Sequence, residues 1–143
     1  MITISTNFNM AMKRLRKWQN KFGNAKRFIL NPLAKKEQDR AKDRIRRTKV
    51  DPRNRNWSRW SQSTLESRRR KGNVSYGLLY DTGALHNSIR TSVTNNTMYI
   101  GSGLDYAEYL QMGTYKMDAR PFLGVSNETE DDFVDLLSNI IER

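Results

Sequence analysis

The sequence predicts an α+β fold: a small antiparallel sheet with a central hairpin, packed by an N-terminal, a middle and a C-terminal helix, with a long basic loop. Residues 89–94 and 97–101 alternate apolar and polar side chains and are rich in β-formers, which is typical of a hairpin. Apolar stripes with helical spacing occur near both ends of the chain. With 143 residues and 36% hydrophobic content, we expect one domain with a modest core.

The expected domain, 1–143, divides by composition into three regions. They are a basic helical region (1–49), an irregular basic arm or loop (50–76) and an α+β body (77–143). Residues 1–72 carry 22 Lys and Arg against five Asp and Glu, whereas residues 73–143 carry four against ten. A half this basic is typical of a protein that meets DNA or another polyanion, and the acidic half offers a counter-surface.

The first element is predicted as a helix over about residues 6–22, ended by Gly23-Asn24. Its apolar side chains recur every three to four residues, so they share one face that we expect to pack against the core. They are Phe8, Met12, Leu15, Trp18 and Phe22.

A second helix is predicted over residues 32–49, because Asn31-Pro32 suits a helix start. Its apolar face is thin, and charged side chains surround it. The members of that face are Leu33, Ala34, Ala41 and Ile45. We expect so polar a helix to project from the body or to lie across a partner.

Residues 50–76 follow no consistent period, and Asp51-Pro52 breaks the preceding helix. Two tryptophans stand among arginines in this polar stretch, and we interpret them as exposed members of an interaction arm. The arm residues are Arg53, Arg55, Trp57, Arg59 and Trp60. A short helical turn over 64–72 ends in a basic run.

The body begins with a turn at Asp81-Thr82-Gly83, which caps a short helix over Ala84–Ser88. After the hairpin, a helix over Leu104–Met112 is ended by Gly113. Pro121 pushes the segment around Phe122 into an extended conformation, where we expect a further strand of the sheet.

Ser126 is predicted to cap a terminal helix whose first turns carry acidic residues that suit the helix dipole. Its expected buried stripe is Phe133, Leu136, Leu137, Ile140 and Ile141. The candidate core of the whole chain is Phe8, Leu15, Trp18, Leu85, Ile89, Val93, Ile100, Ala107, Leu110, Phe122, Phe133, Leu137 and Ile140.

Several kinds of chemistry are disfavoured by composition. The chain has no cysteine and one histidine, His86, so disulfides, thiolate metal sites and two-histidine metal sites are excluded, and we expect no metal and no cofactor. No run of about 18 apolar residues indicates a membrane span, and the first residues lack a signal-peptide pattern. We expect no membrane partner and synthesis in the cytoplasm. A hydrolase that uses Asp81 and His86 is the weakest alternative.

A series of short motifs over residues 57–143 resembles the phage virion morphogenesis family, the Mu-type tail-completion proteins of contractile-tailed phages. After Trp57 the series continues through Leu78-Leu79 and Ile100-Gly101. Its main positions are Asp81, Thr82, Gly83, Leu85, Ser88, Tyr106, Ala107, Gln111, Gly113, Arg120, Pro121, Phe122, Leu123 and Gly124. Leu110 departs from the pattern, because relatives often carry histidine there.

The resemblance implies a structural protein, not an enzyme, located at the virion neck. Such a protein completes the tail or joins it to the capsid as a homo-oligomeric ring, of which a hexamer is one form. Its implied partners are the portal-side connector, the tail tube or the sheath, and packaged double-stranded DNA held nonspecifically in the lumen.

The basic run suits the DNA channel or a contact with a neighbouring ring, because phosphate contacts need no base readout. It comprises Arg68, Arg69, Arg70 and Lys71. A simple solvated loop is the plainer interpretation of such a run. The alternative function is a sequence-nonspecific nucleic-acid-binding protein that uses the basic N-terminal half.

Overall fold

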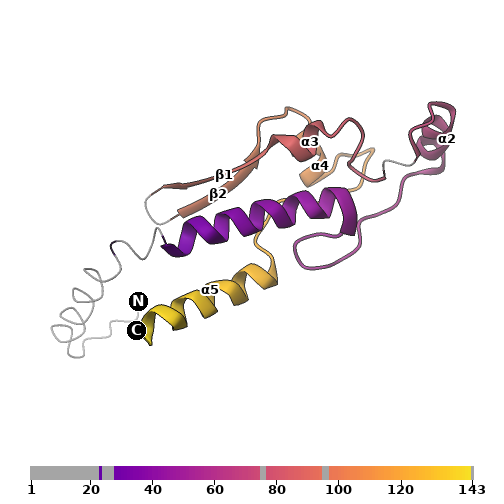
Figure 1. Ribbon diagram of the computed structural model, residues 1–143. Helices are drawn as coiled ribbons and strands as arrows, with labels where there is room; N and C mark the ends of the chain where they lie inside the picture. Colours follow the sequence, from indigo (N-terminus) through magenta and orange to yellow (C-terminus); the bar gives the residue numbers. More distant parts are fainter. Residues whose placement is uncertain (1–22, 24–27, 75–76, 95–96, 143) are drawn as a thin grey trace, which may run out of the picture.

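The computed structural model describes residues 23, 28–74, 77–94 and 97–142, and its α+β class agrees with the sequence prediction (Figure 1). A helix covers 28–43 and continues as one π-helical stretch, η1 (Arg44–Thr48). The remaining elements are α2 (Gln62–Arg70), α3 (Ala84–Ser88), β1 (Ile89–Thr94), β2 (Thr97–Ser102), α4 (Ala107–Met112) and α5 (Asn127–Ile141). The helix expected over 6–22, with the core candidates Phe8, Leu15 and Trp18, lies outside the described residues.

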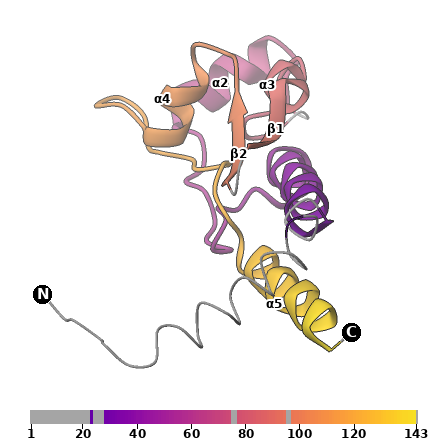
Figure 2. The ribbon, with the colours of Figure 1, turned by 90° about the vertical axis from the view of Figure 1, so that its left-hand side faces the viewer.

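The 28–43 helix occupies the middle of the molecule. Figures 1 and 2 both place it between the β-hairpin on one side and α5 on the other. The expectation that this polar helix projects was therefore wrong. Its thin apolar stripe is fully used, because Ile29, Leu33, Ala34, Ala41 and Ile45 are all buried.

The hairpin forms where alternation of its side chains predicts it. Ile89 pairs with Ser102 and Thr94 with Thr97, and burial alternates along β1. Ile89 faces the core, whereas Val93 and Ile100 are half-buried. The expected further strand near Phe122 is not formed: the sheet of the described chain has two strands. Phe122 and Leu123 form hydrogen bonds with the side chain of Gln111 instead of with a strand.

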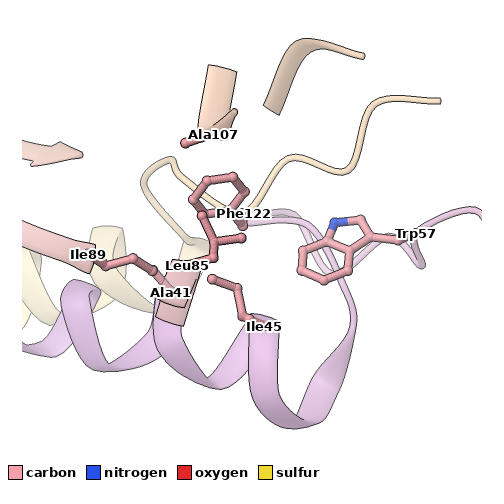
Figure 3. Close-up of a cluster of buried hydrophobic side chains, with 7 residues drawn as sticks. All are labelled: Ala41, Ile45, Trp57, Leu85, Ile89, Ala107 and Phe122. Carbon is pink, nitrogen blue, oxygen red and sulfur yellow. The ribbon is translucent and has the colours of Figure 1, made fainter. Parts of the chain in front are cut away.

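The core gathers side chains of the long helix, η1, α3, β1 and α4 around Phe122 (Figure 3). Ala41 and Ile45 come from the long helix and η1, and Trp57 closes one end of the cluster. Of the candidate core residues, Leu85, Ile89, Ala107 and Phe122 are confirmed as buried. Leu110 and Leu137 are half-buried. Phe133 was wrong, because 41% of its surface is exposed; the burial of Ile140 lies outside the description.

A buried ion pair completes the packing of the long helix. Arg44 Nη2 donates to Glu37 Oε1 at 2.5 Å, and Arg44 Nη1 donates to the carbonyl of Phe122 at 3.0 Å. Glu37 Oε2 accepts from the backbone N–H of Ser126 at 3.2 Å and from its hydroxyl at 2.9 Å. Because Ser126 is the N-cap of α5, this network joins the central helix to the start of the terminal helix.

Candidate interaction surface

The side chains of the basic run at the end of α2 do not all point the same way. Ser61 caps the helix by accepting from Thr64 N–H, as a serine N-cap does. Arg69, Arg70 and Lys71 are exposed at the C-terminal end, where cations suit the helix dipole. Arg68 turns the other way. Its guanidinium lies 4.5 Å from the centre of the Trp60 ring, and Nη1 is 3.9 Å from Asp81 Oδ1. Only three of the four cations therefore face solvent together.

A pocket of about 600 Å³ lies beneath α2 and is shared with the turn before α3 and the loop after α4. Its charged lining includes Arg59, Arg68, Lys116 and Arg120 against Asp81 and Asp118. Arg68 Nη1 is buried here without a hydrogen-bond partner among the described residues.

The predicted interaction arm is docked on the body over much of its length. Trp57 was expected to be exposed, but it is 6% exposed, and its Nε1 donates to the carbonyl of Pro121 at 2.9 Å. Arg53 reaches α5, donating to Glu130 at 3.0 Å and to Asn127. Arg55 bonds Asp51 at 2.6 Å. Trp60, which is half-buried, and Arg59, which is exposed, are the arm residues that line the pocket.

Gln111 supplies hydrogen bonds to the backbone around Phe122, where a further strand was expected. Its Oε1 accepts from the backbone N–H groups of Phe122 and Leu123 at 3.1 and 3.0 Å, and its Nε2 donates to the Leu123 carbonyl at 2.9 Å. One side chain thus replaces a neighbouring strand.

Arg120 holds the arm from the other side of this segment. Its Nε donates to the carbonyl of Ser58 at 2.9 Å and its Nη2 to that of Arg59 at 3.1 Å. Burial lowers the pKa of Arg120. Gln111 and Arg120 therefore have structural roles that their place in the motif series did not reveal.

Two motif glycines stand where a side chain would not fit. Gly113 ends α4 with φ 76°, and a Cβ there would lie 2.7 Å from the backbone nitrogen of Ala119. Gly124 has φ 146°, and its Cβ would lie 2.9 Å from Pro52 Cγ. Both positions require the left-handed freedom and the small size of glycine.

The motif residues between 81 and 88 build the turn into α3 and its link to the hairpin. Thr82 Oγ1 accepts from Ala84 N–H at 3.3 Å, ahead of the buried Leu85. Ser88 Oγ donates to the Leu85 carbonyl at 2.7 Å and lies 2.6 Å from Ser102 Oγ on β2. These contacts fix α3 against the start of the sheet.

The residues of the hydrolase alternative are not brought together. His86 Nδ1 lies 3.0 Å from Asn87 Oδ1, and Asp81 faces Arg68. Over the described ranges, no hydrogen bond joins Asp81 to His86, and no group of three His, Asp or Glu side chains could hold a metal ion. No helix in this part of the chain is long and apolar enough to cross a bilayer.

The sequence analysis missed an exposed aromatic patch, which we define as Tyr106, Tyr109, Met112 and Tyr115. The first three recur every three residues along α4, and Tyr115 follows in the next loop. Met112 is 73% exposed and Tyr115 92%. The three-residue spacing was visible in the sequence, but helical spacing alone does not say which face of a helix is buried.

Comparison with known proteins assigns the family. The model of the phage virion morphogenesis family matches residues 6–142. Searches of curated proteins and of solved structures gave no match. The family match covers the helices, the hairpin and the motif positions described above. The chain therefore belongs to the phage virion morphogenesis family and is a structural protein of a phage virion.

Proposed function

We propose that this protein is a neck subunit, a tail-completion or head–tail connector protein that assembles as a ring around the DNA channel and joins tail to capsid. The observation that carries the proposal, beyond the family, is that the molecule has two unlike ends. α2 carries exposed cations, and α4 with its N-cap carries the exposed Tyr106, Tyr109 and Met112, whereas α5 carries exposed carboxylates. The helices α2 and α5 lie far apart in both views (Figures 1 and 2). Unlike surfaces that meet head to tail are what a closed ring needs.

Packaged DNA in the lumen is the proposed partner of the exposed run Arg69, Arg70 and Lys71, with an acidic surface of a neighbouring ring as the other possibility. Three cations without carboxylate partners among the described residues suit phosphate contacts that need no base readout. Arg68 is not part of this contact, because it is packed on Trp60.

A phage that lacks this gene product tests the proposed place in assembly. Electron microscopy of its lysate should show full heads and finished tails that are not joined. Particles without any tails would move the protein to an earlier step. Normal joined virions would contradict the proposal.

Complementation of the same phage tests whether the position of the basic run matters or only the net charge of the protein. Replacing Arg69, Arg70 and Lys71 with glutamate should reduce joined particles strongly while the protein still folds. The control reverses Arg46, an exposed cation on η1 that has no ion pair among the described residues, and should complement normally. Equal loss in both variants would show that only net charge matters.

The second candidate function is nonspecific nucleic-acid binding, which the same exposed run favours. The number of cations left to contact phosphates is small, which limits the affinity expected. Most other cations between residues 35 and 55 are already paired with carboxylates of this chain, as Lys36 and Arg40 are with Asp132. Three free cations predict a dependence of log affinity on log salt of about −2.7 per subunit. A much steeper slope in a fluorescence-anisotropy titration with duplex DNA would favour the basic N-terminal half as the binding element.

A further inference from the structure

The aromatic patch has the composition of an interface core. Tyrosine, methionine and arginine are enriched where proteins meet, and Tyr106, Tyr109, Met112 and Tyr115 stand together on α4 and the loop after it. None of the four is needed for the core cluster, which α4 joins through Ala107. The patch is therefore available for a partner.

The patch is continuous with the pocket beneath α2. Tyr106 and Lys116 line that pocket together with Arg59, Trp60 and Arg68. A partner that covers the patch would therefore meet the exposed cations Arg59 and Lys116 at its border. Asp81 and Asp118 in the same lining oppose a continuous polyanion such as DNA. The surface fits a protein segment that combines an apolar side chain with a few carboxylates.

The outer face of α5 is such a segment. Its inner side is held by Glu37 and by Lys36 and Arg40, which pair with Asp132 at 3.0 and 2.7 Å. Asp131, Val134 and Asp135 are exposed at spacings of three and four residues, so they share one face of the helix. Val134 is 58% exposed, and neither carboxylate forms an ion pair with another described residue.

We propose that the aromatic patch of one copy receives the outer face of α5 of a second copy. Val134 would lie among the tyrosines, while Asp131 and Asp135 would meet Lys116 and Arg59. Figure 2 shows α4 near the top of the molecule and α5 at the bottom, so the two surfaces of one copy lie apart from each other. The contact is head to tail and repeats from copy to copy. This inference rests on the proposed ring and names the surfaces that build it.

Site-directed cross-linking tests the pairing directly, because the chain has no cysteine of its own. The full-length double variant Tyr115→Cys/Val134→Cys is treated with a short bis-maleimide, which tolerates more separation than a disulfide does. A ladder of dimers, trimers and longer species is expected. Tyr115→Cys mixed with Val134→Cys should give the dimer alone, since each copy then carries one reactive end.

The matched control is Tyr99→Cys/Val134→Cys, because Tyr99 is an exposed tyrosine on β2, away from the patch. The reaction is run on the purified chain and on phage particles complemented with each variant. A ladder no stronger than that of the control in both samples would overturn the inference. Efficient dimers of Tyr115→Cys alone would also overturn it, because they would indicate a patch-to-patch contact.

Charge exchange gives an independent readout by sedimentation velocity. Asp131→Lys/Asp135→Lys and Arg59→Glu/Lys116→Glu should each weaken self-association about tenfold or more. The two sets combined in one chain should restore it, and failure to restore it would contradict the pairing.

The failure of this inference is separable from that of the proposed function. Virions that contain the protein but give no ladder would keep the neck role and assign the patch to another virion protein. A ladder with heads and tails that join without this protein would keep the pairing and remove the neck role.

Discussion

Two basic segments of this chain use their charge in different ways. In the central 28–43 helix, Lys35, Lys36 and Arg40 each have a carboxylate partner in the same molecule. At the end of α2, Arg69, Arg70 and Lys71 have none among the described residues. The comparison teaches that the basic half is not one surface. Part of its charge holds the acidic terminal helix in place, and the remainder is available for a partner.

Glu37→Gln should have the largest effect on stability, because it breaks the buried ion pair with Arg44 that holds the 28–43 helix in the core. The substitution leaves Arg44 buried without its counter-charge and weakens the contact with the cap of α5. We expect a loss of about 3–5 kcal/mol in the free energy of unfolding, measured by urea denaturation. Asp39→Asn, which removes the exposed pair with Lys35, is the control and should cost under about 1 kcal/mol. Equal losses would mean that burial of the pair is irrelevant.

Gln111→Ala tests the support beneath the candidate surface. It removes three hydrogen bonds to the backbone of Phe122 and Leu123. Because half-buried backbone groups are left unpaired, we expect a loss of about 1–3 kcal/mol by the same measurement. Hydrogen exchange at the amides of 122 and 123 should accelerate. Unchanged exchange would show that another group holds the segment.

Lys49 is a third kind of basic side chain: it is half-buried and bonds to backbone carbonyls, with no carboxylate partner among the described residues. Its Nζ donates to the carbonyls of Leu78, at 2.8 Å, and Ile45, and burial lowers its pKa from 10.5 to about 8. Between these values the unfolded chain binds more protons than the folded one, so this residue's contribution to stability rises with pH. Relative to Lys49→Gln, the wild type should gain stability from pH 8 to pH 10. Lys71→Gln, at an exposed position, should show no such trend.

Asp132→Asn tests the ion pairs by which Lys36 and Arg40 of the 28–43 helix hold α5. Hydrogen bonds from Lys36 and Arg40 lower the pKa of Asp132, so its contribution is present at neutral pH and is lost as the carboxylate is protonated in acid. Because both cations are partly exposed, the expected loss at pH 7 is about 0.2–1 kcal/mol. The difference from wild type should shrink toward pH 3. A constant difference would point to packing and not to charge.

Arg69→Gln/Arg70→Gln/Lys71→Gln should have the smallest effect on stability, within about 0.5 kcal/mol, because these side chains contact solvent. Its effect should appear in assembly instead, as fewer joined particles on complementation. A large loss of stability would remove the contrast between the two basic segments.

The sequence by itself determined the elements that local chemistry specifies. Alternating side chains set the hairpin, Ser126 set the start of α5, and Gly113 set the end of α4. The motif order was enough to indicate the family. These features depend on residues that are close together in the chain, so they can be recognised from the sequence.

Only the tertiary structure decided which faces meet. Trp57 is buried because Pro121, 64 residues later, offers a carbonyl, and Arg68 leaves the basic run because Trp60 and Asp81 lie beside it. The long helix became central because Glu37 and Arg44 neutralise each other and bond to the distant Ser126 and Phe122. Periodicity tells which side chains share a face, but the burial of that face depends on long-range partners that no local pattern contains.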